Sequence, residues 1–435
     1  MSTKDQQTIR DLLTFLDGSP TAWHAVENCA QALARERFIH LREEDPWQIK
    51  PGGRYFVTRN GSSLCAFVVP KKTPTALRVA ASHTDSPTFK LKPKAEFFKE
   101  NMLLLGLETY GSPIISSWLN RDLGIAGRVV FKDKKGTIHE KLVRLDQTPV
   151  VIPQLAIHLD REVNEKGTIL NKQEHLAALA SLGVPSKGHS TFIERAIHAL
   201  FPFQTLLSTE LFLYPLEPAR LFGEGQELIS SYRIDSLTSV HAALQGLLHA
   251  NKEDNHLIKM IAFWDNEEIG SNTTQGAASP FFMHLLERLM LALNLSREDY
   301  LRLLPASLCV SVDLSHAMHP NYTDKHEPHH IALLNKGVSI KTQAQYRYAS
   351  DARSVATIVE LCHEHKIPFQ HYVPRGDIPA GTTIGPIHAS LSGMPTVDIG
   401  CTQLSMHSCR EITGVIDHLS MCRLLGTFLA CSNQS

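Results

Sequence analysis

Residues 257–268 read LIKMIAFWDNEE, and this stretch decides the fold. An almost unbroken apolar run from Leu257 to Trp264 is followed at once by four polar residues. A short apolar run of this kind is typical of a strand that is buried on both faces, as in a parallel sheet. Glu267 and Glu268 come directly after that strand. Taken alone they could be an ordinary acidic start of a helix, where the helix dipole favours carboxylates.

The same pattern of an apolar run followed by polar residues recurs elsewhere in the chain. It is found at Leu77 to Ala81 before Ser82-His83-Thr84-Asp85, at Leu308 to Val312 before Asp313, and at Thr396 to Ile399 upstream of His407. Helical spacing of apolar residues follows Ile234-Asp235-Ser236, where Asp235 or Ser236 is placed to cap the helix, and again follows Ser350. Strands that alternate with helices predict an α/β fold with a doubly wound, mostly parallel sheet. Ligands on such sheets bind beyond the carboxyl ends of the strands, where these polar residues lie.

A second domain is predicted inside the first. The segment from 92 to 231 contains short runs punctuated by glycine, such as Gly127 to Phe131, together with helical-looking segments around Ala177 and Ala196. We therefore expect a discontinuous first domain of residues 1–91 and 232–435, with a β-rich domain of residues 92–231 inserted into it. Two helices are expected between Thr8 and Leu33, separated by the turn Asp17-Gly18-Ser19-Pro20.

Composition narrows the class of partner. The 435 residues include 43 Lys and Arg against 44 Asp and Glu, so no basic field favours nucleic acid or an anionic membrane. The eight cysteines form no CxxC pair, which indicates reduced, mostly buried thiols. The first ten residues lack the pattern of a secretory signal, and no run of about 18 apolar residues occurs, so we expect a cytoplasmic protein that acts on small molecules or peptides.

The polar residues at the strand ends form a ligand set for metal. It comprises His83, Asp235, Asp313 and His407, together with one of the two glutamates Glu267 and Glu268. Each of these is ambiguous alone, because a structural histidine or acid paired with a neighbour is commoner than a ligand. Together, nitrogen and oxygen ligands without cysteine suit Zn²⁺, Mn²⁺ or Co²⁺, and a bridging carboxylate suits two ions. One glutamate of the pair could then bind metal while the other acts as general base, and Asp85 could orient the His83 ring.

Eight sequence blocks carry a resemblance to a known family. They are SHTDSPTFKLKP, NRDLGIAGRV, LAIHLDREVNE, DNEEIGS, SVDLSHAMHPNY, KGVSIKTQAQYRYAS, GTTIGPI and MHSCRE. In this order they resemble the M18 metallopeptidases, and in particular a bacterial relative of aspartyl aminopeptidase, over nearly the whole chain. Two departures are Ser236 where the family usually has Asn, and Tyr110-Gly111-Ser112-Pro113 in place of a glycine run.

The resemblance implies a role for each member of the ligand set. His83 and Asp313 would hold one metal and Glu268 and His407 the other, with Asp235 bridging, Glu267 as general base and Asp85 behind His83. Zn²⁺ is the expected ion in both places. The resemblance also implies that the inserted domain mediates dimerisation, and that dimers assemble into a tetrahedral dodecamer with active sites facing an inner chamber.

Further candidates come from the same blocks. His158 is flanked by apolar residues and is either a core histidine or, by resemblance, an active-site residue that faces metal or an oxyanion, from its own or a neighbouring subunit. Lys341 and Tyr348 would line the substrate pocket, where a cation could pair an acidic side chain. Gly381 and Thr382 would belong to a loop that approaches the substrate closely, since the segment lacks the lysine and serine of a phosphate-binding loop.

The sequence thus predicts an aminopeptidase that uses two divalent metals and prefers acidic N-terminal residues. Removal of neutral residues, and a deacylase or dipeptidase reaction on the same scaffold, remain open, because fold and ligands do not fix the substrate. An inactive metal-binding scaffold is the alternative outside the enzymes. The preferred residue, the physiological metal and the oligomeric state are not fixed by the sequence.

Overall fold

The computed structural model describes residues 2–183, 190–250 and 256–430. The chain divides into two compact units. Unit 1 comprises Met1–Asp85, Ala219–Met406 and Glu411–Ser435, and unit 2 comprises Ser86–Pro218 and His407–Arg410.

Unit 1 is built on a nine-stranded sheet. In spatial order its strands are β1 (Ile39–His40), β2 (Arg54–Arg59), β3 (Ser63–Val68), β13 (Leu257–Trp264), β4 (Ala76–His83), β14 (Leu308–Val312), β18 (Thr396–Gly400), β16 (Val338–Lys341) and β17 (Phe369–Tyr372). The four central strands β13, β4, β14 and β18 are parallel to one another. Trp264 pairs with His83 and Val312 with Ile399, so the strands end side by side. The doubly wound, mostly parallel sheet predicted from the sequence is therefore confirmed.

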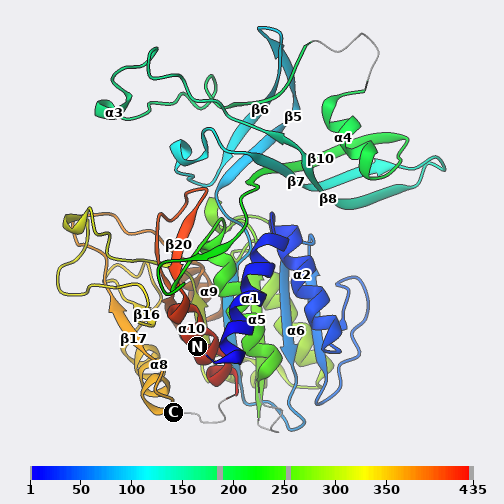
Figure 1. The fold of residues 1–435 in the computed structure, drawn as a ribbon. Coiled ribbons are helices and arrows are strands. Elements are labelled where there is room, and N and C mark those ends of the chain that lie inside the picture. Colours follow the sequence, from blue (N-terminus) through cyan, green and yellow to red (C-terminus); the bar gives the residue numbers. More distant parts are fainter. Residues whose placement is uncertain (1, 184–189, 251–255, 431–435) are drawn as a thin grey trace. The chain divides into compact units, whose positions relative to one another are not determined.

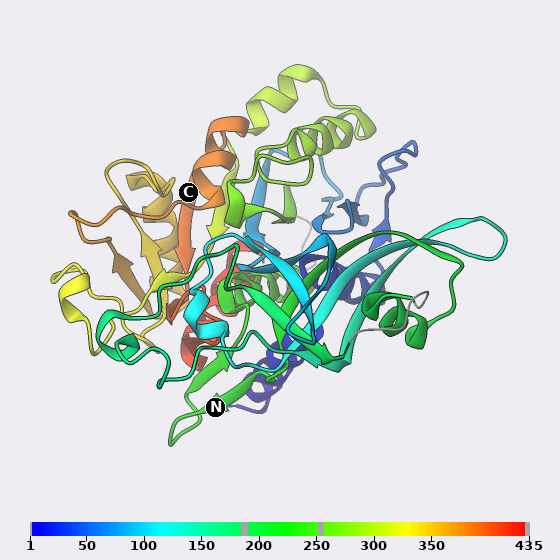
Figure 2. The ribbon, with the colours of Figure 1, turned by 90° about the horizontal axis from the view of Figure 1, so that it is seen from above.

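Helices cover both faces of this sheet. One layer contains α1 (Thr3–Gly18), α2 (Ala22–Arg35), α5 (Ile234–His249), α8 (Ala352–Glu364) and α10 (Val415–Ala430), and the other contains α6 (Phe281–Ala292), α7 (Arg297–Leu303) and α9 (Ile384–Ser392). In β13, Ile261 and Phe263 face the first layer whereas Met260 and Ala262 face the second. The strand is apolar throughout because both of its faces are buried. Figure 1 shows α1, α5 and α10 in front of the strands, and Figure 2 shows α6 on the opposite side from α1.

A smaller sheet in unit 1 joins segments that are distant in sequence. Its order is β11 (Arg220–Phe222), β12 (Leu228–Ser231), β20 (Glu411–Gly414), β19 (Thr402–Leu404) and β15 (Ser315–His316). Two short 3₁₀ helices also belong to this unit, η2 (Glu267–Ile269) and η3 (Thr323–Lys325). Because β12 leads directly into α5, this sheet fixes the point at which the chain reaches Asp235.

Unit 2 is rich in β-structure, as the sequence predicts. Its antiparallel sheet has the order β8 (Ile138–Val150), β7 (Leu123–Lys132), β10 (Thr205–Pro215), β5 (Thr88–Lys99), β6 (Met102–Tyr110) and β9 (Ala177–Leu182), accompanied by η1 (Ile115–Trp118), α3 (Val163–Lys166) and α4 (Phe192–Leu200). The helix expected around Ala196 is α4. The helix expected around Ala177 is wrong, because this segment pairs with β6 as strand β9. Alanine and leucine favour a helix locally, but pairing to an open sheet edge overrides that preference.

The division between the units differs from the expected boundaries at 91/92 and 231/232, since it falls at 85/86 and 218/219. Residues after Thr88 already pair within the sheet of unit 2 as β5. Residues 220–231 form β11 and β12, and β12 pairs with β20 of unit 1. Strand pairing, which a composition change does not reveal, sets both limits.

Six of the seven cysteines in the described ranges are buried, as expected, and Cys422 is half-buried. Cys431 lies outside the described residues. Within the same ranges, no helix combines the length and apolar character that a membrane crossing requires.

Candidate metal centre

His83 is the last residue of β4 and lies at the centre of the candidate site in unit 1. Its side chain is almost fully buried. Nε2 lies 3.2 Å from Asp235 Oδ1 and 3.4 Å from Asp313 Oδ1, while Nδ1 faces the Asp85 backbone oxygen at 3.1 Å. Burial alone would lower the pKa of His83, but the neighbouring carboxylates Asp235, Asp313 and Asp85 raise it well above the usual range. The surroundings of this imidazole therefore favour a positive charge.

Asp235 reaches the site from the start of α5. Arg233, two residues before Asp235, has a left-handed backbone conformation (φ 63°), and the Asp235–Ser236 peptide bond is cis. Asp235 and Ser236 have non-helical backbone angles, and Arg233 at the start of α5 forms no side-chain cap, so capping by Asp235 or Ser236 stays a prediction. The Asp235 carboxylate lies beside His83, and the Asp235 N–H donates to Glu411 Oε2 at 3.0 Å.

Glu267 and Glu268 begin a tight turn after β13. Asn266 adopts a left-handed conformation (φ 65°), and η2 follows. Both oxygens of Asp85 accept hydrogen bonds from this turn, Oδ1 from the Glu267 N–H and Oδ2 from the Glu268 N–H, each at 3.1 Å. Asp85 therefore holds the backbone of both glutamates, and its predicted support of His83 stays a prediction. Burial raises the pKa of Glu267 well above its usual range, and nearby carboxylates add to this against the opposing charge of His83.

The donor atoms of this cluster suit a cation. One atom each from His83, Asp235 and Asp313 lies within 4.8 Å of the others, and the same holds for His83, Glu267 and Glu268. Carboxylate and imidazole donors without thiolate suit borderline and hard divalent ions. Several carboxylates that share a buried site repel one another unless a cation lies between them. The donor set therefore fits the metal that the sequence predicts.

Lys341, at the end of β16, is buried and lies beside Asp313. Its ammonium donates to the Leu314 carbonyl at 2.9 Å and lies 3.7 Å from Asp313 Oδ2. The same ammonium lies 5.0 Å from the centre of the Tyr348 ring, within the range of a cation–π contact. Asp313 thus joins the candidate metal cluster to the predicted substrate residues.

Tyr348 and Gly381 line a cavity of about 460 Å³ in unit 1. The rest of its lining is rich in histidine and includes His316, His319, His326 and His330, together with Tyr372 and Arg375. Lys341 and Thr382 are not among its lining residues, and the Thr382 hydroxyl donates to the Arg347 carbonyl at 3.2 Å. A substrate role for Tyr348 and Gly381 is thus compatible with the geometry, and the roles of all four residues stay predictions.

His407 and His158 belong to unit 2. His407 follows β19 of unit 1 along the chain and its Nδ1 lies 3.2 Å from the Ser112 carbonyl. His158 lies exposed in a turn between the exposed side chains Ile157 and Leu159, so it is not a core histidine. Its active-site role and the metal ligation by His407 stay predictions.

Three buried polar residues that support the site were not singled out from the sequence. Glu411 accepts from the Asp235 N–H, and the Arg233 guanidinium donates to the Thr84 carbonyl. Asp398, in β18, accepts from the Ala349 N–H at 2.6 Å and from the Thr383 hydroxyl at 2.7 Å. The signal for Asp398 is a carboxylate inside an apolar strand. Glu411 and Arg233 flank loops, where sequence pattern carries no such signal.

The chain is similar to proteins of one known family over nearly its whole length. Residues 15–429 match the profile of the family described as "Aminopeptidase I zinc metalloprotease (M18)". A probable M18 family aminopeptidase 2 of Clostridium novyi is 38% identical, covering 94% of this chain and 95% of that protein. A probable aspartyl aminopeptidase of Ricinus communis is 35% identical, covering 96% and 95%.

Solved structures show the same fold. A chain from the cryo-EM structure of the Ape4 and Nbr1 complex superposes with a TM-score of 0.92 at 33% identity, covering 99% of this chain and 87% of that one. A chain from the structure of the S. cerevesiae mApe1 dodecamer superposes with a TM-score of 0.85 at 27% identity, covering 98% and 97%.

Proposed function

Because the chain belongs to the M18 family and is a metal-dependent aminopeptidase, we propose that the cluster around His83 is its catalytic centre and that it holds two zinc ions. The observation that carries this proposal is the convergence of His83 on Asp235 and Asp313 at 3.2 and 3.4 Å. In this proposal His83 and Asp313 would hold one ion and Glu268 and His407 the other, with Asp235 shared by both. Zinc held by these residues would activate water near neutral pH and would polarise the scissile carbonyl.

Glu267 is the residue that we propose as the proton carrier. It is half-buried, and the Asp85 carboxylate fixes its backbone N–H. Burial favours the protonated form of Glu267, and in this proposal the carboxyl group takes a proton from water and passes it to the leaving amine. Asp85 and Lys341 are positioning residues, because Asp85 holds the glutamate turn and Lys341 holds Asp313.

The Glu267→Gln variant tests this assignment. Glutamine keeps the volume but cannot accept a proton, so kcat should fall by about 10²–10⁴-fold while bound zinc, measured by elemental analysis, stays unchanged. Glu287→Gln, on the exposed surface of α6, is the matched control. A Glu267→Gln enzyme with undiminished kcat would disprove the proton-transfer role.

We further propose a preference for acidic N-terminal residues, and its source is the histidine-rich cavity. The lining carries several imidazoles with Lys325 and Arg375, and the one carboxylate in it, Glu327, already lies 2.8 Å from His330 Nδ1. Such a lining favours a negatively charged side chain over a neutral one.

A panel of peptides that begin with Asp, Glu, Leu or Ala, compared with N-acetylated versions, tests the substrate. We expect the highest kcat/KM for Asp or Glu and no turnover of blocked peptides. A clear preference for Leu would contradict the acidic assignment alone, whereas faster hydrolysis of the acetylated peptides would indicate a deacylase.

Assembly into a homo-oligomer through unit 2 is the last part of the proposal. Support comes from exposed apolar side chains in unit 2, with Leu155, Leu159 and Ile169 exposed by 58%, 74% and 83%, and from the similar mApe1 structure, which is a dodecamer. His158 lies in the same exposed segment, and we propose that it serves the site of a neighbouring copy. Sedimentation should show an oligomer, and mixing His158→Ala with Glu267→Gln subunits should restore activity. A monomer that is fully active would contradict this part.

A further inference from the structure

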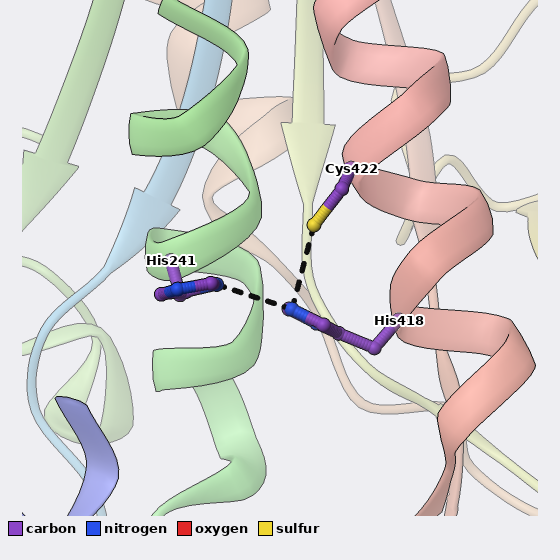
Figure 3. Close-up of side chains that lie close together, drawn as sticks. All are labelled: His241, His418 and Cys422. Carbon is purple, nitrogen blue, oxygen red and sulfur yellow. Dashed lines mark hydrogen bonds between the residues drawn. The ribbon is translucent and has the colours of Figure 1, made fainter. Parts of the chain in front are cut away.

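A second cluster of metal-binding side chains lies in unit 1 between α5 and α10, and the function proposed above does not use it. His241 of α5 faces His418 and Cys422 of α10 (Figure 3). His418 and Cys422 are four residues apart, so they occupy the same helix face one turn apart. His241 Nδ1 lies 3.1 Å from His418 Nε2, which in turn lies 3.4 Å from Cys422 Sγ.

The two distances from His418 Nε2, 3.1 Å and 3.4 Å, are close to those between ligand atoms of a tetrahedral metal site. Nitrogen ligands about 2.05 Å and a sulfur ligand about 2.3 Å from a zinc ion lie roughly 3.3–3.6 Å from one another. The three donor atoms all lie within 4.8 Å of one another. Two imidazoles and one thiol thus provide three ligands and leave the fourth position open.

The two imidazoles are in the neutral state that binds metal, whereas the thiol must first lose its proton. Burial lowers the pKa of His241 to about 3, and burial together with His241 lowers the pKa of His418 well below its usual range, so both rings are neutral. Burial raises the pKa of the Cys422 thiol to about 12. The thiol therefore keeps its proton until a metal ion displaces it into solvent, and binding strengthens as pH rises.

Hydrogen bonding within the described residues satisfies only one nitrogen of each ring. His241 is 2% exposed and His418 fully buried, and in the described part of the chain neither His241 Nε2 nor His418 Nδ1 has a hydrogen-bond partner. A buried imidazole with one nitrogen unpaired is costly in an apolar helix interface. The outer nitrogens also lack the carboxylate or carbonyl that usually supports a ligating histidine, and such support changes metal affinity by about 10–100-fold. The site is therefore suited to an exchangeable ion.

An entry path exists. Cys422 lines a surface cavity of about 620 Å³ between α1, α5, α8 and α10, whose lining also includes Gln245, Leu419 and Gly426. An ion can thus reach the sulfur from solvent although both imidazoles are buried.

We propose that His241, His418 and Cys422 form a binding site for a thiophilic divalent ion, of which Zn²⁺ is the reference member. The ion links α10 to α5, the helix whose first turn carries Asp235. The site is separate from the carboxylate cluster around His83 and differs from it in having a sulfur ligand.

Cobalt titration of the full-length protein, stripped of metal beforehand, tests the proposal. Among the residues that the structure describes, the cluster around His83 has no sulfur ligand, so a sulfur-to-cobalt charge-transfer band reports the new site. We expect the band in the wild-type protein, its loss on addition of Zn²⁺, and its retention in Glu268→Gln, which alters only the carboxylate cluster.

Cys422→Ala should abolish the band and remove one bound zinc ion per chain, whereas Cys65→Ala, a buried cysteine in β3 on the other face of the sheet, should keep both. His241→Gln should lower the cobalt affinity, measured from the growth of this band, by at least about tenfold. If the band is absent in the wild-type protein at saturating Co²⁺, the three side chains form a hydrogen-bonded network and no metal site, and the proposal is overturned. A band that survives in Cys422→Ala would also overturn it.

Discussion

Replacing Asp85 by asparagine should disable the site without unfolding the protein. The two oxygens of Asp85 accept from the Glu267 and Glu268 N–H groups at 3.1 Å each. Asparagine keeps one acceptor and places an NH₂ group opposite the other N–H. One hydrogen bond to a charged acceptor is lost and one buried donor is left unpaired.

The magnitude follows from that count. A hydrogen bond to a charged group contributes about 1.5–3 kcal/mol. If this hydrogen bond stabilises the transition state by that free energy, its loss lowers kcat/KM by roughly 10- to 150-fold. Because Asp85 positions Glu267 and Glu268 and does not contact substrate, we expect the loss in kcat, with KM little changed and with partial rescue by excess zinc.

The assay compares kcat, KM, bound zinc and melting temperature of Asp85→Asn with the wild type and with Asp45→Asn, an exposed aspartate. We expect a melting temperature close to that of the wild type, because the turn is a local element at the end of β13. A variant with kcat within twofold of the wild type and full zinc content would refute the idea that Asp85 holds the turn. A rise in KM alone would refute it equally.

Three substitutions test the scaffold around the site. A Cβ at Gly400 would overlap the Asp313 backbone carbonyl, which cannot move aside, so Gly400→Ala should cost about 1–3 kcal/mol or more and lower zinc content, as measured by urea unfolding and elemental analysis. Gly426→Ala, in α10 with open space at its Cβ, is the control and should stabilise the protein by about 0.5–1 kcal/mol; equal effects of the two would disprove the packing argument. Burial lowers the pKa of His388 to about 4, so only the unfolded chain is protonated as pH falls from about 6.5 toward 4, and stability is lost over that window. Between about pH 7.5 and pH 5 this amounts to roughly 2 kcal/mol of apparent unfolding free energy, which His388→Gln should abolish; an unchanged pH slope would contradict it.

The sheet and the members of the candidate site that lie at strand ends could be predicted because both depend on local pattern. Strands β13 and β14 could be predicted because each is an apolar run that stops at polar residues. Asp313 could be predicted as a candidate ligand because it comes directly after β14, and ligands bind beyond the strand ends of such sheets. Strand β9 could not be predicted, because alanine and leucine at 177–180 favour a helix and only pairing with β6 makes a strand. The backbone of Asp235 was missed for a similar reason, since it depends on the left-handed Arg233 and on Glu411, which is 176 residues away along the chain.

The position of Lys341 bears on where substrate specificity resides. A buried lysine is costly unless its charge is compensated, and here Asp313, the Leu314 carbonyl and the Tyr348 ring surround the ammonium. If Lys341 turned to pair an acidic substrate, Asp313 would lose that partner beside the proposed metal, so recognition would weaken the catalytic centre. Recognition of an acidic side chain is therefore better served by the imidazoles of the neighbouring cavity, which hold no candidate ligand in place. Substrate choice and metal binding can then vary independently, although Tyr348 contacts both Lys341 and the cavity.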